Sequence, residues 1–347
     1  MSIGSFSVNP LKNGCTEVRD GAGRTLILVP RRMEMPAGVD PAMVVRTPVK
    51  RVVAYSYFDI AILKALGVLE DVLVGVLTKT EDWYIPEVVQ GMKSGKIKYL
   101  GDYTSIDFEQ LRQAEPDLVL TWDLSILPML AEMKVPCVIS TTPVAMCLNA
   151  RMKFVQFIAP FFNREDEAER YFGRLARTLD SIREQTKDAQ YQPKVMWGDI
   201  YEKRVLVEPG NAWVGELVEL ALSKYQFEDV FGKSCIEISL ERFLYSGQDA
   251  EILFTYRSPS NGATSKAALA RANPLMAGIN PLKPHGKVYS PLPHYSQSGD
   301  KLDEILTEIS AILHPECYPG HQLSYFRALP DTDPEPDTDD KNGNSRS

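Results

Sequence analysis

The sequence predicts an α/β fold of two lobes, each with a mostly parallel central sheet, joined by one long helix and enclosing a ligand cleft. The first observation behind this prediction is an internal repeat. The segment IDFEQL at 106–111, followed by an apolar strand that ends in Thr121-Trp122, is echoed by ISLERF at 238–243, followed by a strand that ends in Thr255-Tyr256. Each copy has a capping residue, a glutamate in the first turn of a short amphipathic helix and then a buried strand. The repeat indicates two Rossmann-like lobes of related design, with ligands beyond the carboxyl ends of the strands.

Length and composition agree with two lobes and exclude several classes of protein. At 347 residues and 44% hydrophobic composition, the chain can bury a sizeable core, and its length favours about two domains. The net charge of −8, with no Lys/Arg block beside aromatic residues, argues against binding nucleic acid. No run approaches the roughly 18 apolar residues of a membrane helix, and the first residues lack the features of a signal peptide. We therefore expect a soluble monomer without an integral membrane segment, whose export signal is absent or already removed.

The N-terminal lobe is predicted to occupy residues 1–148. It opens with a hairpin, 16–20 and 25–29, around a Gly-Ala-Gly turn, and a loop rich in Pro and Met follows to about residue 47. From residue 51 the pattern alternates between strand and helix. The intervals suit right-handed crossovers of a parallel sheet, with strands expected at 52–55, 72–76, 97–100, 118–121 and 137–140.

A rigid inter-lobe segment is predicted at 149–189. Asn163 is expected to cap a helix whose first turn carries the acidic residues 165–167. Apolar residues then repeat at helical spacing, at 168, 172, 175, 179 and 182. A helix of roughly 23 residues, at 1.5 Å per residue, spans about 35 Å and would bridge two lobes without a flexible hinge.

The C-terminal lobe is predicted at 190–329. Strands are expected at 194–198 and 204–207, and a loop-to-helix passage follows at 208–217. The second copy of the repeat comes next, then a strand at 287–289 and a final amphipathic helix at 300–313. Residues 330–347 are acidic, rich in Pro at their start and without apolar side chains, which predicts a disordered tail.

In this order, the segments resemble the substrate-binding proteins of ABC importers for iron chelates, haem and cobalamin, the class III periplasmic binding proteins. The resemblance covers about residues 16–313. It rests on the hairpin ahead of RVV at 51–53, on DFEQL at 107–111 ahead of EPDLV at 115–119, on EPGN at 208–211 ahead of GEL at 215–217, and on Glu241. It implies two α/β lobes joined by one helix, a metal chelate held between them, no catalytic activity, no intrinsic cofactor and a periplasmic or extracytoplasmic location.

The resemblance also implies a partner, the ABC permease dimer, and the residues that meet it. In this family a glutamate at the tip of each lobe contacts arginines of the two permease subunits, and the matching positions are Glu109 and Glu241. Two separated carboxylates on equivalent helix starts suit a two-fold basic surface. The alternative is that each carboxylate only complements its helix dipole, a contribution of about 0.3–1 kcal/mol.

Aromatic residues gather where strand ends are expected to face the cleft. Rigid aromatic walls suit a large flat ligand, because each ring buries much area at low entropic cost. The alternative is that several of them fill the core, and about half are expected to touch the ligand. The strongest candidates are Tyr55, Trp83, Trp122 and Tyr256, and the others are Tyr57, Tyr84, Trp197 and Trp213.

Three further residues follow strands and are candidates for polar ligand contacts. Arg257, directly after Tyr256, is placed to bind a propionate, phosphate or siderophore carboxylate, unless it is an ordinary loop arginine. His294 and Tyr295 lie after another strand, where either could ligate a metal centre in the cleft, although the pattern favours the alternative of a rim histidine without metal. Direct metal ligation thus stays open.

The ligand is expected to be a ferric siderophore or haem, ahead of cobalamin, because phenolate is a natural partner for ferric iron. A corrinoid-binding protein of the same class is the alternative. A cytoplasmic two-lobe metallocofactor enzyme or scaffold is a further alternative, but such proteins usually use cysteine ligands in the cleft. The five cysteines here have no metal-ligand spacing, and no Walker loop, HExxH or Gly-x-Ser-x-Gly motif is present.

Overall fold

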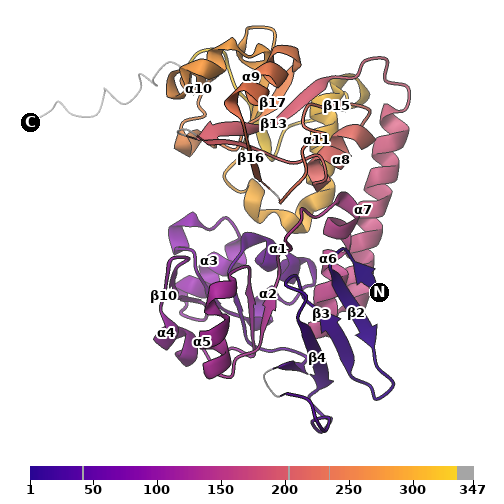
Figure 1. The fold of residues 1–347 in the computed structure, drawn as a ribbon, viewed down its shortest axis with the longest axis vertical. Coiled ribbons are helices and arrows are strands. Elements are labelled where there is room, and N and C mark those ends of the chain that lie inside the picture. The colour runs from indigo at the N-terminus through magenta and orange to yellow at the C-terminus, as the bar shows by residue number, and fades with distance from the viewer. Residues whose placement is uncertain (41–42, 202–203, 234, 334–347) are drawn as a thin grey trace, which may run out of the picture.

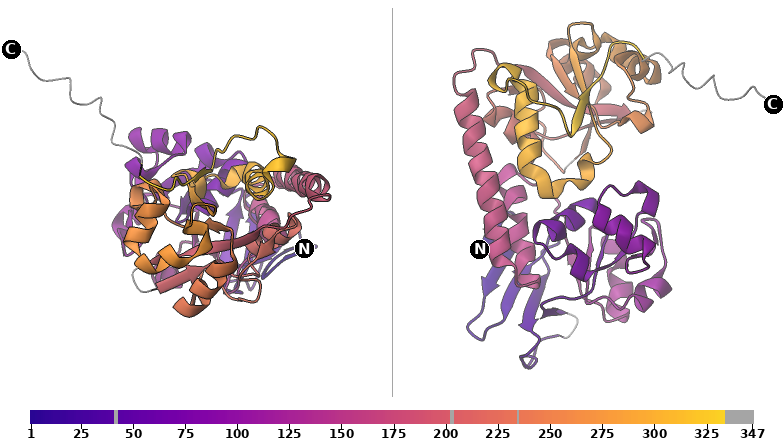
Figure 2. Two further views of the ribbon diagram at one scale, coloured as in Figure 1. Left: turned by 90° about the horizontal axis from the view of Figure 1, so that it is seen from above. Right: turned by 180° about the vertical axis from the view of Figure 1, so that it is seen from behind.

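The computed structural model describes residues 1–40, 43–201, 204–233 and 235–333. The chain forms two α/β lobes stacked along the long axis of the molecule (Figure 1). A separate N-terminal sheet lies beside the first lobe, at the lower end of the longest helix, as Figures 1 and 2 both show. The predicted two-lobe α/β class is confirmed, while the exact domain boundaries at 148, 189 and 329 remain predictions.

The N-terminal sheet is larger than the predicted hairpin. It has five strands in the order β1-β2-β3-β4-β5, with β4 and β5 parallel and the other neighbours antiparallel. The hairpin itself is confirmed by the pairing of β3 with β4. The sheet is anchored on the segment between the lobes, where Phe6 meets the rings of Phe154 and Phe157 at 5.0 and 4.8 Å between centroids. The strands are β1 (Ser2–Ile3), β2 (Phe6–Pro10), β3 (Thr16–Arg19), β4 (Thr25–Pro30) and β5 (Val44–Thr47).

The first lobe contains the predicted five-stranded parallel sheet, in the order β12-β11-β6-β7-β8. Its central strands are apolar and buried, as expected for a sheet covered on both faces. The strands are β6 (Val52–Ala54), β7 (Leu73–Val76), β8 (Lys98–Tyr99), β11 (Leu118–Thr121) and β12 (Cys137–Ile139), and β9 (Gly101–Asp102) and β10 (Ser105–Ile106) form a small hairpin. The helices are α1 (Tyr57–Ala65), α2 (Leu69–Val72), α3 (Pro86–Lys93), α4 (Phe108–Gln113) and α5 (Leu127–Glu132).

The segment between the lobes consists of α6 (Leu148–Ile158) and the long helix α7 (Glu165–Thr186). At 22 residues, α7 is about 33 Å long, and it runs along one side of both lobes (Figures 1 and 2). The predicted N-cap is wrong. Asn163 has a φ of 56°, the left-handed conformation that asparagine tolerates, and the cap position falls on Arg164.

The second lobe has a parallel core with antiparallel edges. In its seven-stranded sheet, β13 pairs in parallel with β15 and β17, β17 pairs in parallel with β18, and β14, β16 and β19 add antiparallel pairs. The strands are β13 (Lys194–Tyr201), β14 (Arg204–Val207), β15 (Lys224–Tyr225), β16 (Ile236–Ile238), β17 (Ile252–Phe254), β18 (Lys287–Pro291) and β19 (Phe326–Ala328). The helices are α8 (Trp213–Leu220), α9 (Leu240–Asp249), α10 (Lys266–Ala272) and α11 (Leu302–Leu313).

The internal repeat is present in the structure. Asp107 caps α4 by accepting a hydrogen bond from the backbone N–H of Gln110 at 2.9 Å, and Ser239 caps α9 by accepting one from Arg242 at 3.1 Å. Each helix then leads into a buried parallel strand, β11 or β17. None of the described helices is long and apolar enough to cross a membrane.

The prediction of disorder from residue 330 is wrong for the first four residues of the tail. The backbone N–H of Lys266 donates to the carbonyl of Pro330 at 2.8 Å, and its ammonium group lies 2.8 Å from the Asp331 carboxylate. Asp333 accepts a hydrogen bond from Ser265 at 2.7 Å and pairs with Arg271. These acidic residues are ordered because the cations and the free N–H groups at the start of α10 face them. Residues 334–347, the rest of the predicted tail, lie outside the described residues.

Candidate functional site

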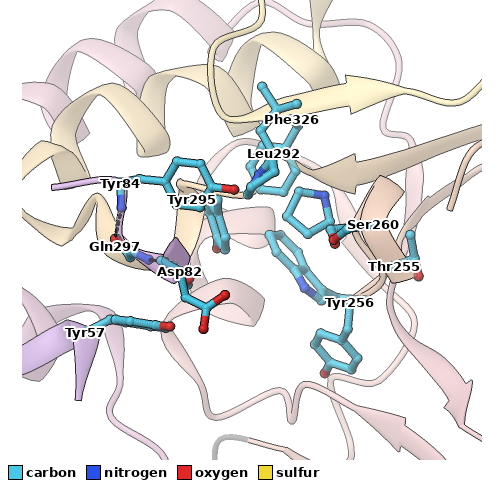
Figure 3. A pocket seen from close by; sticks show the side chains of 15 residues that line it. Tyr57, Asp82, Tyr84, Thr255, Tyr256, Ser260, Leu292, Tyr295, Gln297 and Phe326 are labelled. Atoms are coloured by element: carbon cyan, nitrogen blue, oxygen red, sulfur yellow. Dashed lines mark hydrogen bonds between the residues drawn. The ribbon is translucent and has the colours of Figure 1, made fainter. Parts of the chain in front are cut away.

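Two cavities lie between the lobes and share one wall. The first, of about 510 Å³, is lined by Phe58 of α1, Arg151 of α6 and Trp213 of α8, among others. The second, of about 450 Å³, is lined from the first lobe by Tyr57, Asp82 and Tyr84 (Figure 3) and from the second by residues of the β17 and β18 ends. Both volumes are typical of small-molecule sites. The shared wall consists of Trp197, Tyr256, Tyr295 and Ser296, and we call the two cavities together the inter-lobe cleft.

The cleft brings together most of the predicted aromatic residues. Trp197 is almost buried and stacks on Phe254, with 4.3 Å between ring centroids, so that it presents a rigid surface. Tyr84 and Trp122 are about half exposed and lie at the rims. The predicted residues that line the cleft are Tyr57, Tyr84, Trp122, Trp197, Trp213, Tyr256 and Tyr295.

Two of the strongest aromatic candidates do not line the cleft. Tyr55 is 2% exposed and still belongs to the sheet, because its backbone N–H donates to the carbonyl of Leu120 at 3.0 Å. Trp83 is 6% exposed, and its indole N–H donates to the carbonyl of Thr78 at 3.1 Å. The Trp83 ring packs edge to face against the ring of Tyr57, with 5.1 Å between the ring centroids. The prediction that Tyr55 and Trp83 contact ligand is therefore corrected to a supporting role in the core.

Arg257 forms its ion pair and hydrogen bonds within the protein. Its Nε lies 3.1 Å from the carboxylate of Asp199, which is fully buried, and its terminal nitrogen donates to the carbonyl of Ile200 at 2.6 Å. The guanidinium carbon also lies 4.6 Å from the ring centre of Tyr201. Arg257 lines neither cavity of the cleft, so its position does not support the prediction that it binds an anionic group of the ligand.

His294 lies outside the cleft. Its Nε2 lies 2.9 Å from the carbonyl oxygen of Ser324, which can only accept, so this nitrogen carries the proton and Nδ1 keeps its lone pair. The ring lines neither cavity of the cleft, so its position does not support the predicted contact with a metal centre held there. Within the described ranges, no group of three or more His, Cys, Asp or Glu side chains could hold a metal ion.

Arg151 is the central residue that the sequence reasoning missed. Its guanidinium carbon lies 4.4 Å from the ring centre of Phe58 in the first lobe and 5.2 Å from that of Trp213 in the second. Its Nε is buried without a hydrogen-bond partner, and the guanidinium has no ion pair with any described residue. Burial lowers the pKa of Arg151, but a guanidinium stays charged at neutral pH. The available signal was one arginine within the largely apolar segment LNARMKFVQFI of α6.

Glu208 and two tyrosines surround this cation. Burial raises the pKa of Glu208 to about 7, although the charge of Arg151 and a hydrogen bond with Tyr256 act in the opposite direction. Burial also raises the pKa of Tyr256 and Tyr295, so both stay neutral phenols at physiological pH. The cleft thus offers aromatic faces, an unpaired cation, neutral donors and one carboxyl group that titrates near neutrality. This set can hold a flat chelate that carries an anionic group.

One side chain fastens the lobes to each other beside the cleft. The amide oxygen of Gln297 accepts from the backbone N–H of Tyr84 at 2.8 Å, and its amide nitrogen donates to the carbonyl of Asp82 at 2.7 Å (Figure 3). Gln297 belongs to the second lobe and is buried, whereas Asp82 and Tyr84 belong to the first. The bidentate contact fixes the distance across which a ligand must fit.

Comparison with known proteins is consistent with this geometry. A sequence model of the family described as periplasmic binding protein matches residues 52–290. An uncharacterized lipoprotein of Methanocaldococcus jannaschii is 24% identical over 302 residues, which covers 83% of this chain and 70% of that protein.

Solved structures with the same fold include two binding proteins. The periplasmic heme-binding protein RhuT from Roseiflexus sp. RS-1 is 16% identical, with a TM-score of 0.59 over 77% of this chain and 99% of that one. The periplasmic vitamin B12 binding protein BtuF of Vibrio cholerae is 17% identical, with a TM-score of 0.55 over 78% of this chain and 99% of that one. At this level of identity the likeness establishes the shared fold and leaves the ligand to be argued from the cleft.

Proposed function

The chain belongs to the periplasmic binding protein family, and from this premise we propose that it is the substrate-binding component of an ABC importer. It captures a metal chelate, a ferric siderophore or haem, in the inter-lobe cleft and delivers it to a permease dimer. The family and the lipoprotein relative support an extracytoplasmic location. The observation that carries the proposal is the unpaired guanidinium of Arg151, held between aromatic rings of both lobes. An anionic group of a flat ligand satisfies that charge while the rings cover its faces.

The binding test uses the purified protein and four probes: haemin, a ferric catecholate siderophore, a ferric hydroxamate siderophore and cyanocobalamin. Tryptophan quenching reports the affinities, since Trp122, Trp197 and Trp213 line the cleft, and visible absorption identifies the bound chromophore. We expect tight binding of an iron complex. Tight binding of cyanocobalamin alone would establish the corrinoid alternative, and no binding of any probe would contradict the proposal.

Chelate affinity should depend on pH through Glu208. When ionised, its carboxylate competes with an anionic ligand for Arg151, and a bound anion raises the pKa of Glu208 above its free-protein value of about 7. Binding above pH 7 therefore takes up a proton, so the affinity should fall as pH rises. The fall should be up to about fivefold between pH 7 and 8, and the affinity should level off below pH 7. Affinity titrations of an anionic chelate from pH 6 to 8.5 measure this slope.

Two variants separate Glu208 from general pH effects. Glu208→Gln should flatten the profile and retain high affinity at pH 8. Glu219→Gln, a change of the same kind at an exposed position on α8, should keep the wild-type slope. An unchanged slope in Glu208→Gln would assign the pH dependence to another group.

Docking on the permease should depend on Glu109 and Glu241. Both side chains are exposed in the first turns of α4 and α9, one helix on each lobe, and neither has an ion pair among the described residues. Like charges placed opposite each other across an interface cost several kcal/mol. Glu109→Arg or Glu241→Arg should therefore lower transport by about tenfold or more, the double variant should be the most defective, and ligand affinity should stay within about twofold. Uptake into cells or proteoliposomes with the cognate permease measures the effect.

The matched control is Glu165→Arg. Glu165 is also an exposed glutamate in a first helical turn, that of α7, so it reports the helix-dipole cost of the change without a docking role. Normal transport by the Glu109 and Glu241 variants, or an equal defect in the control, would show that the two glutamates do not dock.

A further inference from the structure

A third cavity lies between the N-terminal sheet and the two lobes. We call it the N-terminal groove. Its volume is about 940 Å³, and its walls are the β1–β2 turn, the β3–β4 turn at 21–23 and the segment 141–143 after β12. The sheet that forms one side precedes residue 52, where the family match begins. The groove is therefore built largely by a part of this chain that lies outside the matched region.

The groove is continuous with the inter-lobe cleft. Four residues line both spaces: Trp122, Thr141, Thr142 and Lys233. The ring of Trp122 stands at the junction, 44% exposed, with Tyr103 at 5.8 Å between centroids. A molecule bound in the cleft can thus extend past Trp122 into the groove.

The turn that forms the groove wall is held rigidly. Asp20 is fully buried, and its carboxylate accepts from the backbone N–H of Ile139 at 3.1 Å and from the guanidinium of Arg24 at 2.6 Å. The backbone N–H of Gly21 donates to the carbonyl of Ile139 at 2.9 Å. A Cβ on Gly21 would lie 1.6 Å from the carbonyl oxygen of Thr141, so only glycine permits this approach. A preformed wall lowers the entropic cost of binding.

The charged residues of the groove are all cationic. Arg19 and Lys233 line it, and no Asp or Glu does. The Nε of Arg19 donates to the carbonyl of Gly23 at 3.1 Å. Neither Arg19 nor Lys233 has an ion pair with any described residue, and the Lys233 side chain has no hydrogen bond with one. In a chain with a net charge of −8, this local excess of positive charge favours an anionic group.

We infer that the N-terminal groove is a second subsite that holds an anionic arm of the same chelate whose metal-binding core occupies the inter-lobe cleft. The protein then selects elongated chelates with a negatively charged end over compact ones with the same core. This inference rests on the proposed function, since the arm is positioned by a core bound between the lobes.

The test compares ligands that share a core and differ only at the end of one arm. Ferrioxamine B carries an ammonium group there, its N-acetyl derivative is neutral, and its N-succinyl derivative carries a carboxylate. We expect wild-type protein to bind the succinyl form at least about tenfold more tightly than ferrioxamine B, with the acetyl form between them. Fluorescence titration at fixed pH and two salt concentrations measures the preference, which should shrink at high salt.

Three variants locate the preference. Arg19 lines the groove and not the cleft, so Arg19→Glu should remove or reverse the preference, by lowering the affinity for the succinyl form and raising that for ferrioxamine B. Ala22→Trp, which fills the groove from the turn, should remove the preference without a change of charge. Lys12→Glu, an equal charge change at an exposed position near the same sheet but outside the groove, should behave as wild type.

The outcomes separate this inference from the proposed function. Equal affinity of wild-type protein for the three ferrioxamines, or a preference that survives both Arg19→Glu and Ala22→Trp, overturns the groove subsite while the binding function stands. If none of the ferrioxamines and none of haemin, the ferric catecholate or cyanocobalamin binds, the proposed function fails, and the subsite fails with it.

Discussion

Arg151→Met should lower the affinity for an anionic chelate by at least about a hundredfold, a loss of about 2.7 kcal/mol, and leave the free energy of unfolding unchanged or higher. The guanidinium lies in the cleft without an ion pair to any described residue, and its carbon is close to the rings of Phe58 and Trp213. A charge-assisted contact to a desolvated anion contributes on this scale. The fold should not suffer, because methionine replaces the unbranched aliphatic stem of the arginine and the change removes a guanidinium whose Nε is buried without a hydrogen-bond partner.

The control for this variant lies on the same helix. Lys153→Met removes a cation from α6 that faces the ring of Phe172, 5.7 Å from its centre, outside the cleft. It should leave chelate affinity within about twofold of wild type. Arg151→Lys should be intermediate, because it keeps the charge and loses the planar fork. If Arg151→Met bound the chelate with normal affinity, Arg151 would not bind the anionic group, and the proposed ligand position in the cleft would be wrong.

Arg257→Ala should affect stability instead of affinity. It should lower the free energy of unfolding by about 3–5 kcal/mol, while the protein that remains folded binds its chelate normally. Arg257 is the ion-pair partner of Asp199, whose side chain is fully buried. Without the guanidinium, the carboxylate keeps only the Thr255 hydroxyl and the N–H of Ile200. Burial already raises the pKa of Asp199, so the variant should lose further stability as rising pH ionises this carboxyl. Urea unfolding monitored by circular dichroism measures the change.

The double variant Asp199→Asn/Arg257→Met tests this explanation. It removes both charges together, so it should recover a large part of the stability that Arg257→Ala loses. A stable Arg257→Ala protein with lost chelate affinity would instead restore the ligand-binding role that the sequence suggested for Arg257.

Two tyrosines near the end of β6 show what the local sequence pattern does not predict about the site. Tyr55 and Tyr57 lie at and just after the end of the first parallel strand, and the sequence makes both ligand candidates, with Tyr55 the stronger of the two. In the structure, Tyr55 is still paired with β11 and points into the core, while Tyr57 begins α1 and lines the cleft. The end of the strand decides between the two roles, because Tyr55 keeps the backbone pairing of the sheet, whereas the chain has turned into α1 at Tyr57 and the side-chain directions of the strand no longer apply.

The sequence by itself determined the order of strands and helices, the repeated capped helices that carry Glu109 and Glu241, and the long helix between the lobes. These features depend on periodicity and on caps, which act between residues a few positions apart. Only the tertiary structure decided which arginine is paired within the protein and which lies in the cleft without an ion pair among the described residues. Arg257 forms an ion pair with Asp199, which lies 58 residues earlier in the chain. Arg151 has no ion pair with a described residue and lies close to the rings of Phe58 and Trp213, both far from it in sequence. Whether a charge is paired depends on partners that the fold brings together over such distances, and local sequence patterns do not contain that information.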